Sequence, residues 1–385
     1  MNKQRVLSGL DQLQKYDHLL KGRRIGLMTN HTGINLNFES AIDIISRDYN
    51  LTALFACEHG IRGTIQAGEQ VDTTVDERTG VPVFSCYGGS GRLTSEMLSM
   101  FDVFVFDMQD VGARFYTYLY SLSYAMEECA RYGKSVLVLD RINPIGGQKV
   151  EGTILDERFH SFVGEYSLPT RYGLTIGEYA LWVKRHLNLD LDLTVAPLKG
   201  WYREFMLPDC AVPWVAPSPN INCFESAMCY IGTCVFEGTN LSEGRGTPLP
   251  FQVVGAPWVN GFELAKRMNQ KKIAGVHYRE CSFSPNMSKH AGELCQGVQL
   301  HITDAENFDA FAAGLYLLDE IRTLHGDKFE FLTGKVLNSQ SHLDKLLGTD
   351  LYRLGGKNAS QIIKMNAYDI DTFKKERQQY FLYRL

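Results

Sequence analysis

Four short apolar runs, alternating with helical patterns, constrain the fold of this chain most strongly. The runs span residues 24–30, 51–59, 102–110 and 135–141, and each is nearly continuous in apolar side chains. Parallel strands that are covered on both faces have this composition. Helical patterns at 40–49 and 118–133 lie between the runs, and residues 81–87 form a fifth candidate strand. The alternation predicts an α/β fold with an open, mostly parallel sheet and right-handed crossovers.

The length of the chain predicts two domains. Its 385 residues exceed what a single hydrophobic core usually supports. Past residue 150 the alternation gives way to a segment rich in proline and loops, at 160–222. Strand candidates at 278–285 and 297–303, together with later helical patterns, predict an α+β second part. We therefore expect one domain at 1–222 and a smaller one at 223–385.

Polar side chains follow each of the four main strand candidates. In open α/β sheets, ligands bind outside the carboxyl ends of the strands, so these coincidences predict a site at that edge. Polar residues at strand ends can also simply serve turns. The residues concerned are Asn30, His31, Glu58, His59, Asp107, Gln109, Asp110, Asp140, Arg141 and Asn143.

A second polar segment, "FEGTNLSEGRGTPLPF" at 236–251, lies in the other half of the chain. It combines two carboxylates, Glu237 and Glu243, with Asn240, Arg245 and three glycines. This is the composition of a loop that carries site chemistry, although a capped turn with a solvated charge pair would read similarly.

Composition and motifs argue against several functional classes. The net charge of −5, without a basic block, is not typical of a nucleic-acid binder. No run of 18 apolar residues predicts a membrane span. The segment "YGGSGRLTSE" at 87–96 matches neither nucleotide-binding signature, and G-x-S-x-G is absent. We therefore expect no cofactor.

The cysteines and the amino terminus bear on the cellular compartment of the protein. Nine cysteines without a C-x-x-C pair indicate buried free thiols and a reducing compartment. The amino terminus lacks a secretory signal, which favours the cytoplasm.

Glu58 and His59 with Asp107 and Asp110 could supply metal ligands, but adjacent residues on a strand point to opposite faces. We expect no metal.

Several long motifs resemble those of one family. "TNHTG", "CEHGIRG", "DMQDVGARFYTY", "LDRINPIGG", "SPNI" and "FEGTNLSEGRGTPLPF" are similar to the motifs of exo-β-N-acetylmuramidases of the NamZ type. The resemblance implies a Rossmann-like N-terminal domain, a smaller C-terminal α/β domain and a cleft between them. It also implies release of terminal N-acetylmuramic acid from the non-reducing end of peptidoglycan fragments. Many members are exported, so a secreted or cell-wall location is the alternative to the cytoplasm.

Glu58 matches the proposed catalytic glutamate of that family. A carboxyl at the end of a buried strand can hold its proton near neutral pH and protonate the departing oxygen. Glycosidases usually pair such an acid with a second carboxylate, and an acetamido group of the substrate is the known alternative. The candidates for the second carboxylate are Asp107, Asp110, Glu237 and Glu243.

The remaining candidate residues are predicted to bind the sugar. A bidentate arginine suits the lactyl carboxylate of muramic acid, and Arg62, Arg114 and Arg245 lie in the richest motifs. The full set is Asn30, His31, His59, Arg62, Gln109, Arg114, Tyr116, Asp140, Asn143, Asn220, Asn240 and Arg245. A non-catalytic cell-wall sugar-binding protein and a metal-dependent hydrolase are the alternatives. The sequence leaves open whether the protein is a monomer or a homodimer.

Overall fold

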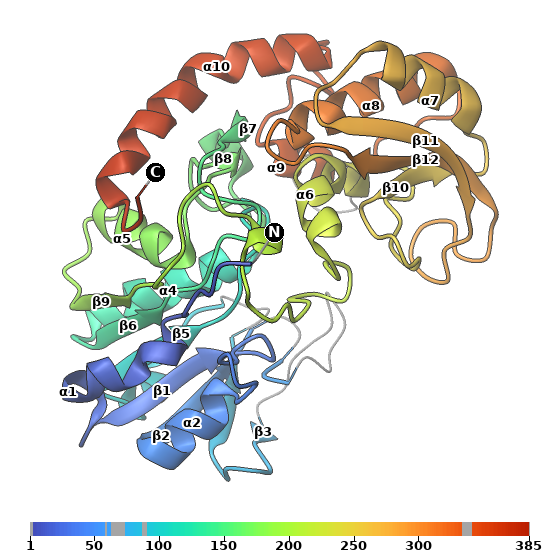
Figure 1. Ribbon diagram of the computed structural model, residues 1–385. Helices are drawn as coiled ribbons and strands as arrows, with labels where there is room; N and C mark the ends of the chain where they lie inside the picture. The colour runs from blue at the N-terminus through green and yellow to red at the C-terminus, as the bar shows by residue number, and fades with distance from the viewer. Residues whose placement is uncertain (1–2, 58–59, 63–73, 87–90, 333–340, 385) are drawn as a thin grey trace.

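The computed structural model describes residues 3–57, 60–62, 74–86, 91–332 and 341–384. Its main element is a seven-stranded sheet in the order β3-β4-β2-β1-β5-β6-β9 (Figure 1). All neighbouring strands pair in parallel except β3 and β4. The strands are β1 (Arg24–Thr29), β2 (Asn50–Ala56), β3 (Thr74–Val75), β4 (Pro82–Ser85), β5 (Val103–Asp107), β6 (Ser135–Leu139) and β9 (Leu193–Ala196). The predicted α/β fold is confirmed.

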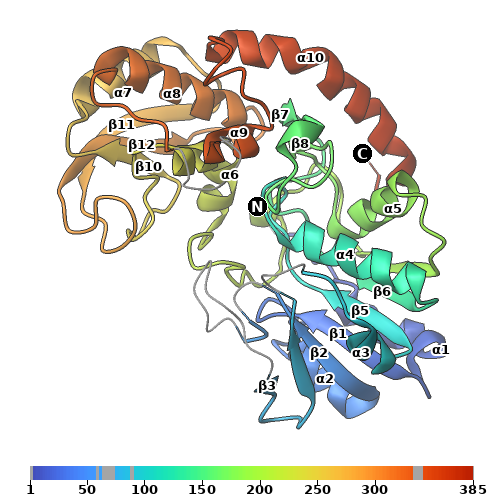
Figure 2. The same cartoon turned by 180° about the vertical axis from the view of Figure 1, so that it is seen from behind.

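Helices cover both faces of this sheet because alternate side chains of each strand point to opposite faces. On β5, Val103 and Val105 pack into one apolar cluster, whereas Phe104 and Phe106 pack into another. The first cluster includes α2 (Ala41–Asp48) and the 3₁₀ helix η1 (Leu10–Tyr16). The second includes α3 (Ser95–Ser99), α4 (Tyr118–Arg131) and α5 (Ile176–His186), and Figure 2 shows α4 over β5 and β6.

The strand order places a switch point between β1 and β5. The chain moves outward from β1 to β2 and β4, and then returns to the other side of β1 to build β5, β6 and β9. In such doubly wound sheets the crevice outside the carboxyl ends of the strands at the switch point is the usual ligand position. Residues 30–32 and 108–112 follow the two strands at this place.

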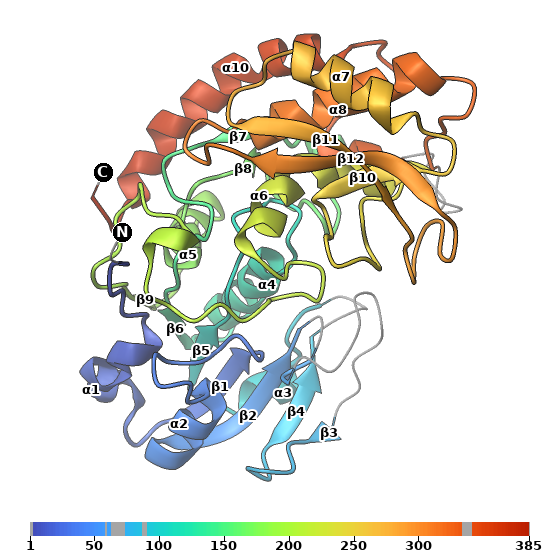
Figure 3. The ribbon, with the colours of Figure 1, turned by 45° about the vertical axis from the view of Figure 1, so that its right-hand side comes forward.

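The second half of the chain builds a smaller antiparallel sheet, β10-β12-β11, with β10 at Val253–Ala256, β11 at Val276–Phe283 and β12 at Cys295–Ile302. Figure 3 shows this sheet above α6 and the main sheet below. The accompanying helices are α6 (Phe224–Thr233), η4 (Cys234–Gly238), α7 (Gly261–Gln270), α8 (Ala310–His325) and α9 (His342–Leu347). Helices α6 and α8 cross at Gly232 and Gly314. A Cβ on Gly232 would lie 1.9 Å from the carbonyl oxygen of Ala310, so the two backbones can approach this closely only without side chains.

The chain ends by returning to the first half. Helix α10 (Ala359–Glu376) and η5 (Arg377–Tyr380) run from the small sheet back to α5 (Figure 1). There the Tyr383 hydroxyl accepts a hydrogen bond from the Leu198 amide at 2.8 Å and donates one to Asp140. Between the two parts lies the two-stranded sheet of β7 (Glu151–Ile154) and β8 (Pro169–Arg171). The remaining short helices are α1 (Asp17–Leu20), η2 (Glu157–Phe159) and η3 (Leu207–Asp209). Among the described helices, none has the length and apolar character that a membrane span requires.

Candidate active site

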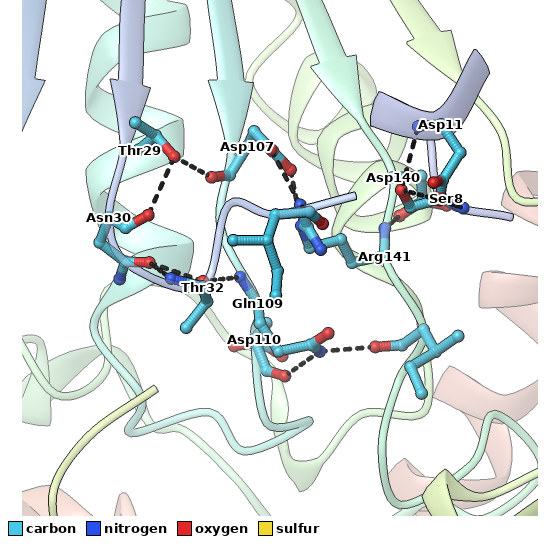
Figure 4. A network of polar contacts seen from close by, with 12 residues as sticks. Ser8, Asp11, Thr29, Asn30, Thr32, Asp107, Gln109, Asp110, Asp140 and Arg141 are labelled. Carbon is cyan, nitrogen blue, oxygen red and sulfur yellow. Dashed lines mark hydrogen bonds and ion pairs between the residues drawn. The ribbon is translucent and has the colours of Figure 1, made fainter. Parts of the chain in front are cut away.

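Asp107 lies at the carboxyl end of β5 and forms a closed ion pair (Figure 4). Its two carboxylate oxygens accept hydrogen bonds from Arg141 Nε at 2.6 Å and Arg141 Nη2 at 2.9 Å. Burial raises the pKa of Asp107, and the charge of Arg141 opposes that shift. Asp107 is fully buried, and its ion pair with Arg141 joins the ends of β5 and β6.

Asn30 and Gln109 tie the strand ends at the switch point together (Figure 4). Asn30 Oδ1 accepts hydrogen bonds from the amide and the hydroxyl of Thr32, at 2.9 and 2.6 Å. The Thr32 hydroxyl accepts one from the Gln109 amide at 3.0 Å, and Gln109 Nε2 donates to the Ile142 carbonyl at 2.8 Å. These bonds fix the turns after β1, β5 and β6 against one another.

Three further predicted site residues use their side chains to hold backbone. Asp140 accepts hydrogen bonds from the Gly177 amide at 2.7 Å and the Thr175 hydroxyl at 2.8 Å, which fixes the start of α5. Asn143 donates to the Leu174 carbonyl at 2.9 Å. Asp110 accepts from the Gly112 amide at 2.7 Å and from the Tyr172 hydroxyl. All three are buried, and their hydrogen bonds hold the turns after β5 and β6 in place.

A cavity of about 120 Å³ lies where the two halves of the chain meet. Its walls come from the turn before α4, the 218–221 loop, α6, η4, the segment after η4 and α9. Tyr230 packs edge-on against Phe115 and Phe251, with ring centroids 4.8 and 4.6 Å apart. The polar and aromatic lining consists of Phe115, Tyr116, Thr117, Ser218, Tyr230, Glu237, Arg245 and Phe251. The lining therefore combines aromatic walls with a few polar groups, which is the kind of lining that ligand sites have.

Glu237 and Arg245 supply the charge in this cavity. Arg245 Nη2 contacts Glu237 Oε1 at 2.6 Å, and His342 Nε2 lies 3.5 Å from Glu237 Oε2. Burial alone would raise the pKa of Glu237, but the hydrogen bond from His342 and the charge of Arg245 lower it to about 2. The Glu237 side chain is 22% exposed. Glu237 is therefore an ionised carboxylate that solvent and ligands can reach.

Glu243 lies behind this pair and not in the cavity. Its side chain is only 1% exposed, and its two oxygens lie 3.4 Å from Arg245 Nε and 2.7 Å from Lys289 Nζ. Glu243 is thus a buried counter-charge, and Glu237 is the carboxylate that lines the cavity.

The side chains of His31 and Tyr118 hold the 214–222 loop, which contains Asn220, by contacts to its backbone. His31 Nε2 lies 2.8 Å from the Ala216 carbonyl oxygen, and the Tyr118 hydroxyl donates to the Pro217 carbonyl at 2.8 Å. Tyr116 and Ser218 line the cavity, whereas the Asn220 amide donates to Ser218 Oγ at 3.5 Å. His31 thus connects the end of β1 to the wall of the cavity.

Two of the three predicted arginines are engaged elsewhere. Arg62 contacts Asp76 at 2.6 Å. Arg114 is fully buried, and its guanidinium donates to the carbonyls of Thr153, Leu168 and Leu346 at 2.6, 2.8 and 2.6 Å. The structure therefore gives Arg114 a role in joining the two halves of the chain, and Arg245 is the arginine that lines the cavity.

Asn240 also binds backbone, since its Nδ2 donates to the Lys328 carbonyl at 2.8 Å and its Oδ1 accepts from the Glu330 amide at 3.0 Å. Glu58 and His59 lie outside the described residues. His342 and Lys289 were not predicted from the sequence, because each stands alone in its segment without a motif. Within the described part of the chain, no group of three His, Cys, Asp or Glu side chains could hold a metal ion.

Comparisons with known proteins identify the family. The N-terminal domain model of exo-β-N-acetylmuramidase NamZ matches residues 25–225, and the C-terminal domain model matches residues 228–383. The peptidoglycan β-N-acetylmuramidase NamZ of Bacillus subtilis (strain 168) is 44% identical over 387 residues, covering 99% of this chain and 92% of that protein.

Two solved structures are similar to the chain over nearly its whole length. Crystal structures of two DUF1343 family proteins from Bacteroides fragilis NCTC 9343 are each 32% identical to the chain, with TM-scores of 0.89 and 0.76. The alignments cover 99% and 98% of this chain, and 99% of each of those chains. The chain therefore belongs to the NamZ family of exo-β-N-acetylmuramidases and is a glycoside hydrolase.

Proposed function

We propose that the cavity between the start of α4 and η4 binds the terminal N-acetylmuramic acid of a peptidoglycan fragment, and that Glu237 is the second catalytic carboxylate. Glu237 carries the proposal. Of the four candidates, it is the one that lines the cavity, whereas Asp107, Asp110 and Glu243 are each at most 5% exposed. The aromatic walls suit the apolar C–H faces of a sugar ring.

The ionisation of Glu237 determines which role it can take. A carboxyl whose pKa is lowered to about 2 has no proton to give at neutral pH, so it cannot be the general acid. It can act as nucleophile, as base for a water molecule, or as a charge that stabilises the oxocarbenium-like transition state. Glu58 matches the proposed catalytic glutamate of the family, and its predicted place at the end of a buried strand suits it to the acid role. Glu58 would then act as the acid, and Glu237 would act as the ionised carboxylate.

Hydrolysis of a disaccharide of N-acetylmuramic acid and N-acetylglucosamine tests this assignment. We expect Glu237→Gln to lower kcat on the order of 10² to 10⁴-fold, because the amide keeps the shape but loses the charge. Glu225→Gln, at an exposed position on α6, is the matched control and should keep wild-type activity. Sugar binding without any turnover by the wild-type protein would instead identify a non-catalytic sugar-binding protein.

Azide identifies the face of the sugar on which Glu237 lies. In Glu237→Ala, azide can enter the vacated space and attack the anomeric carbon as the bond to the leaving sugar breaks and that sugar takes a proton from the general acid. Because the cleaved linkage is β, attack from the opposite face gives an α-muramyl azide. We expect this product and a partial recovery of the rate. A rate that is insensitive to azide, with no azide adduct, would remove Glu237 from the reacting centre.

The thiols bear on where the enzyme works. The nine cysteines form no disulfide in the described structure, and seven of them are buried. Thiols in this number are typical of a reducing compartment, which supports a cytoplasmic enzyme that acts on imported or recycled fragments. Fractionation of cells that produce the native chain tests this proposal, and recovery of the protein from the medium or the wall would contradict it.

Sedimentation of the same protein would establish whether it is a monomer or a homodimer.

A further inference from the structure

The loop between β11 and β12 packs on the segment that carries Glu237 and Arg245. The Asn286 amide donates to the Gly246 carbonyl at 2.9 Å, and His290 Nε2 lies 2.8 Å from the Asn240 carbonyl oxygen. Lys289 Nζ donates to the carbonyls of Phe236 and Thr239, at 2.7 and 3.0 Å. Four contacts from one loop therefore fix the backbone on both sides of Glu237.

This loop holds unfavourable backbone conformations to reach that position. Ser288 and His290 have φ of 66° and 58°, in the left-handed region that residues other than glycine rarely adopt. Such conformations persist where the surrounding structure determines them, and they cluster at functional sites. The residue between them is Lys289, which points its ammonium at the 236–243 segment.

A chain of alternating charges leads from Lys289 into the cavity. Lys289 Nζ lies 2.7 Å from Glu243 Oε2, and Glu243 Oε1 lies 3.4 Å from Arg245 Nε. Arg245 Nη2 in turn lies 2.6 Å from Glu237 Oε1. A buried carboxylate without a cation is costly, so the charge of Glu243 must be balanced by whichever cation is near.

We propose that Lys289 is a positioning residue of the hydrolysis, which neutralises Glu243 so that Arg245 can bind and orient Glu237. This inference rests on the proposed function of Glu237. Without Lys289, the only other cation that contacts Glu243 in the described residues is Arg245, which would move toward Glu243 and away from Glu237. Glu237 would lose its orientation and its stabilising charge together.

The other ionisable groups around Glu237 do not replace Lys289. His342 contacts the outer oxygen of Glu237 and does not contact Glu243 in the described structure. Tyr230 and Cys234 face the same carboxylate, and burial raises the pKa of both, so they remain neutral and supply no cation. The balance of charge behind Glu237 therefore depends on Arg245 and Lys289.

The test is a cycle of variants assayed on the muramic acid–glucosamine disaccharide across pH. We expect Lys289→Met to lower kcat by about 10 to 100-fold, because misplacement of a catalytic group by a fraction of an ångström to 1 Å has effects of this size. The acidic limb of the kcat profile should move to higher pH, since Glu237 becomes easier to protonate. Lys266→Met, an exposed lysine on α7, removes the same charge and should change neither quantity.

The double variant Glu243→Gln with Lys289→Met gives the decisive result. With Glu243 neutral, Arg245 has no competing carboxylate, so we expect kcat and the acidic limb to return toward wild type. If Lys289→Met fails to fold, recovery of a folded, active double variant supports the same charge balance. An unchanged pH profile in Lys289→Met, or a loss that Glu243→Gln does not repair, overturns the proposal. Failure of the proposed function is recognised separately, because Glu237→Gln would then keep its activity.

Discussion

Replacing Arg114 with methionine should destabilise the protein by about 3 kcal/mol. The guanidinium donates to three buried carbonyls, those of Thr153, Leu168 and Leu346. The Leu168 carbonyl keeps the Leu155 amide as a donor at 3.2 Å. The carbonyls of Thr153 and Leu346 lose a charged donor, which costs about 3 kcal/mol each at the upper end of the range for a buried group left unsatisfied, so the two together cost about 6 kcal/mol. Methionine carries no charge, so removing the buried guanidinium charge recovers part of this cost in the free energy of unfolding. Burial lowers the pKa of Arg114 from 12.5 to about 10, and each unit corresponds to about 1.4 kcal/mol, so about 3 kcal/mol is recovered.

The free energy of unfolding in urea at pH 7, followed by tryptophan fluorescence, measures this effect. Arg47→Met is the control, because Arg47 is an exposed arginine whose partners are surface carboxylates, and it should unfold at the wild-type urea concentration. Arg114→Lys should fall between the two, since an ammonium can keep part of the donor set. A loss below about 1 kcal/mol in Arg114→Met would refute the reasoning, because it would mean that the carbonyls of Thr153 and Leu346 find other donors at little cost.

Three further outcomes are expected. Burial raises the pKa of Asp110 to about 6, so the folded state binds the proton more tightly and wild-type stability should fall by roughly 3 kcal/mol as pH rises from about 4 to 6. Asp110→Asn should lack this decline, and parallel unfolding curves for the two proteins would contradict it. EDTA should leave the hydrolysis rate unchanged, because carboxylate catalysis requires no Lewis acid; loss of the rate with recovery on adding a divalent ion would favour a metal-dependent hydrolase. Glu58→Gln should lower kcat on the order of 10² to 10⁴-fold on the natural disaccharide but far less on a nitrophenyl muramide, whose departure needs little protonation, and equal losses would contradict the acid role.

The strands of the main sheet could be predicted because burial on both faces leaves continuous apolar runs. Strands β1, β2, β4, β5 and β6 lie within or beside the predicted runs. Strand β9 was missed because it has four residues and only one of them, Ala196, is fully buried. The return of the last residues to α5 was also not predictable, since it depends on single contacts such as that of Tyr383 with Asp140.

Polar residues at strand ends have a structural use that the sequence cannot separate from substrate binding. A buried turn after a strand must satisfy its own amides and carbonyls, and Asn, Asp and Gln do so efficiently. Asp140 and Asn143 meet that need, and their residue types are the same ones that would bind a sugar. The 236–251 motif was more informative, because it brought Glu237 and Arg245 to a cavity. Lys289 and His342 reach the same place from 53 and 105 residues away in the sequence, and no local pattern marks them.

Arg245 remains the arginine best placed to read the lactyl carboxylate of muramic acid. It lines the cavity, and its guanidinium lies 5.1 Å from the ring centre of Phe251, which leaves the side chain fixed between an aromatic face and Glu237. Arg245→Met should lower kcat on every substrate, because Glu237 loses the cation that contacts its Oε1 at 2.6 Å and orients it. KM should rise as well, but only for substrates with a lactyl group, since a planar carboxylate loses its bidentate partner. Comparing the muramic acid disaccharide with a glucosamine analogue separates the two effects. If KM for both substrates changes equally, Arg245 serves Glu237 alone, and the carboxylate is read by another group.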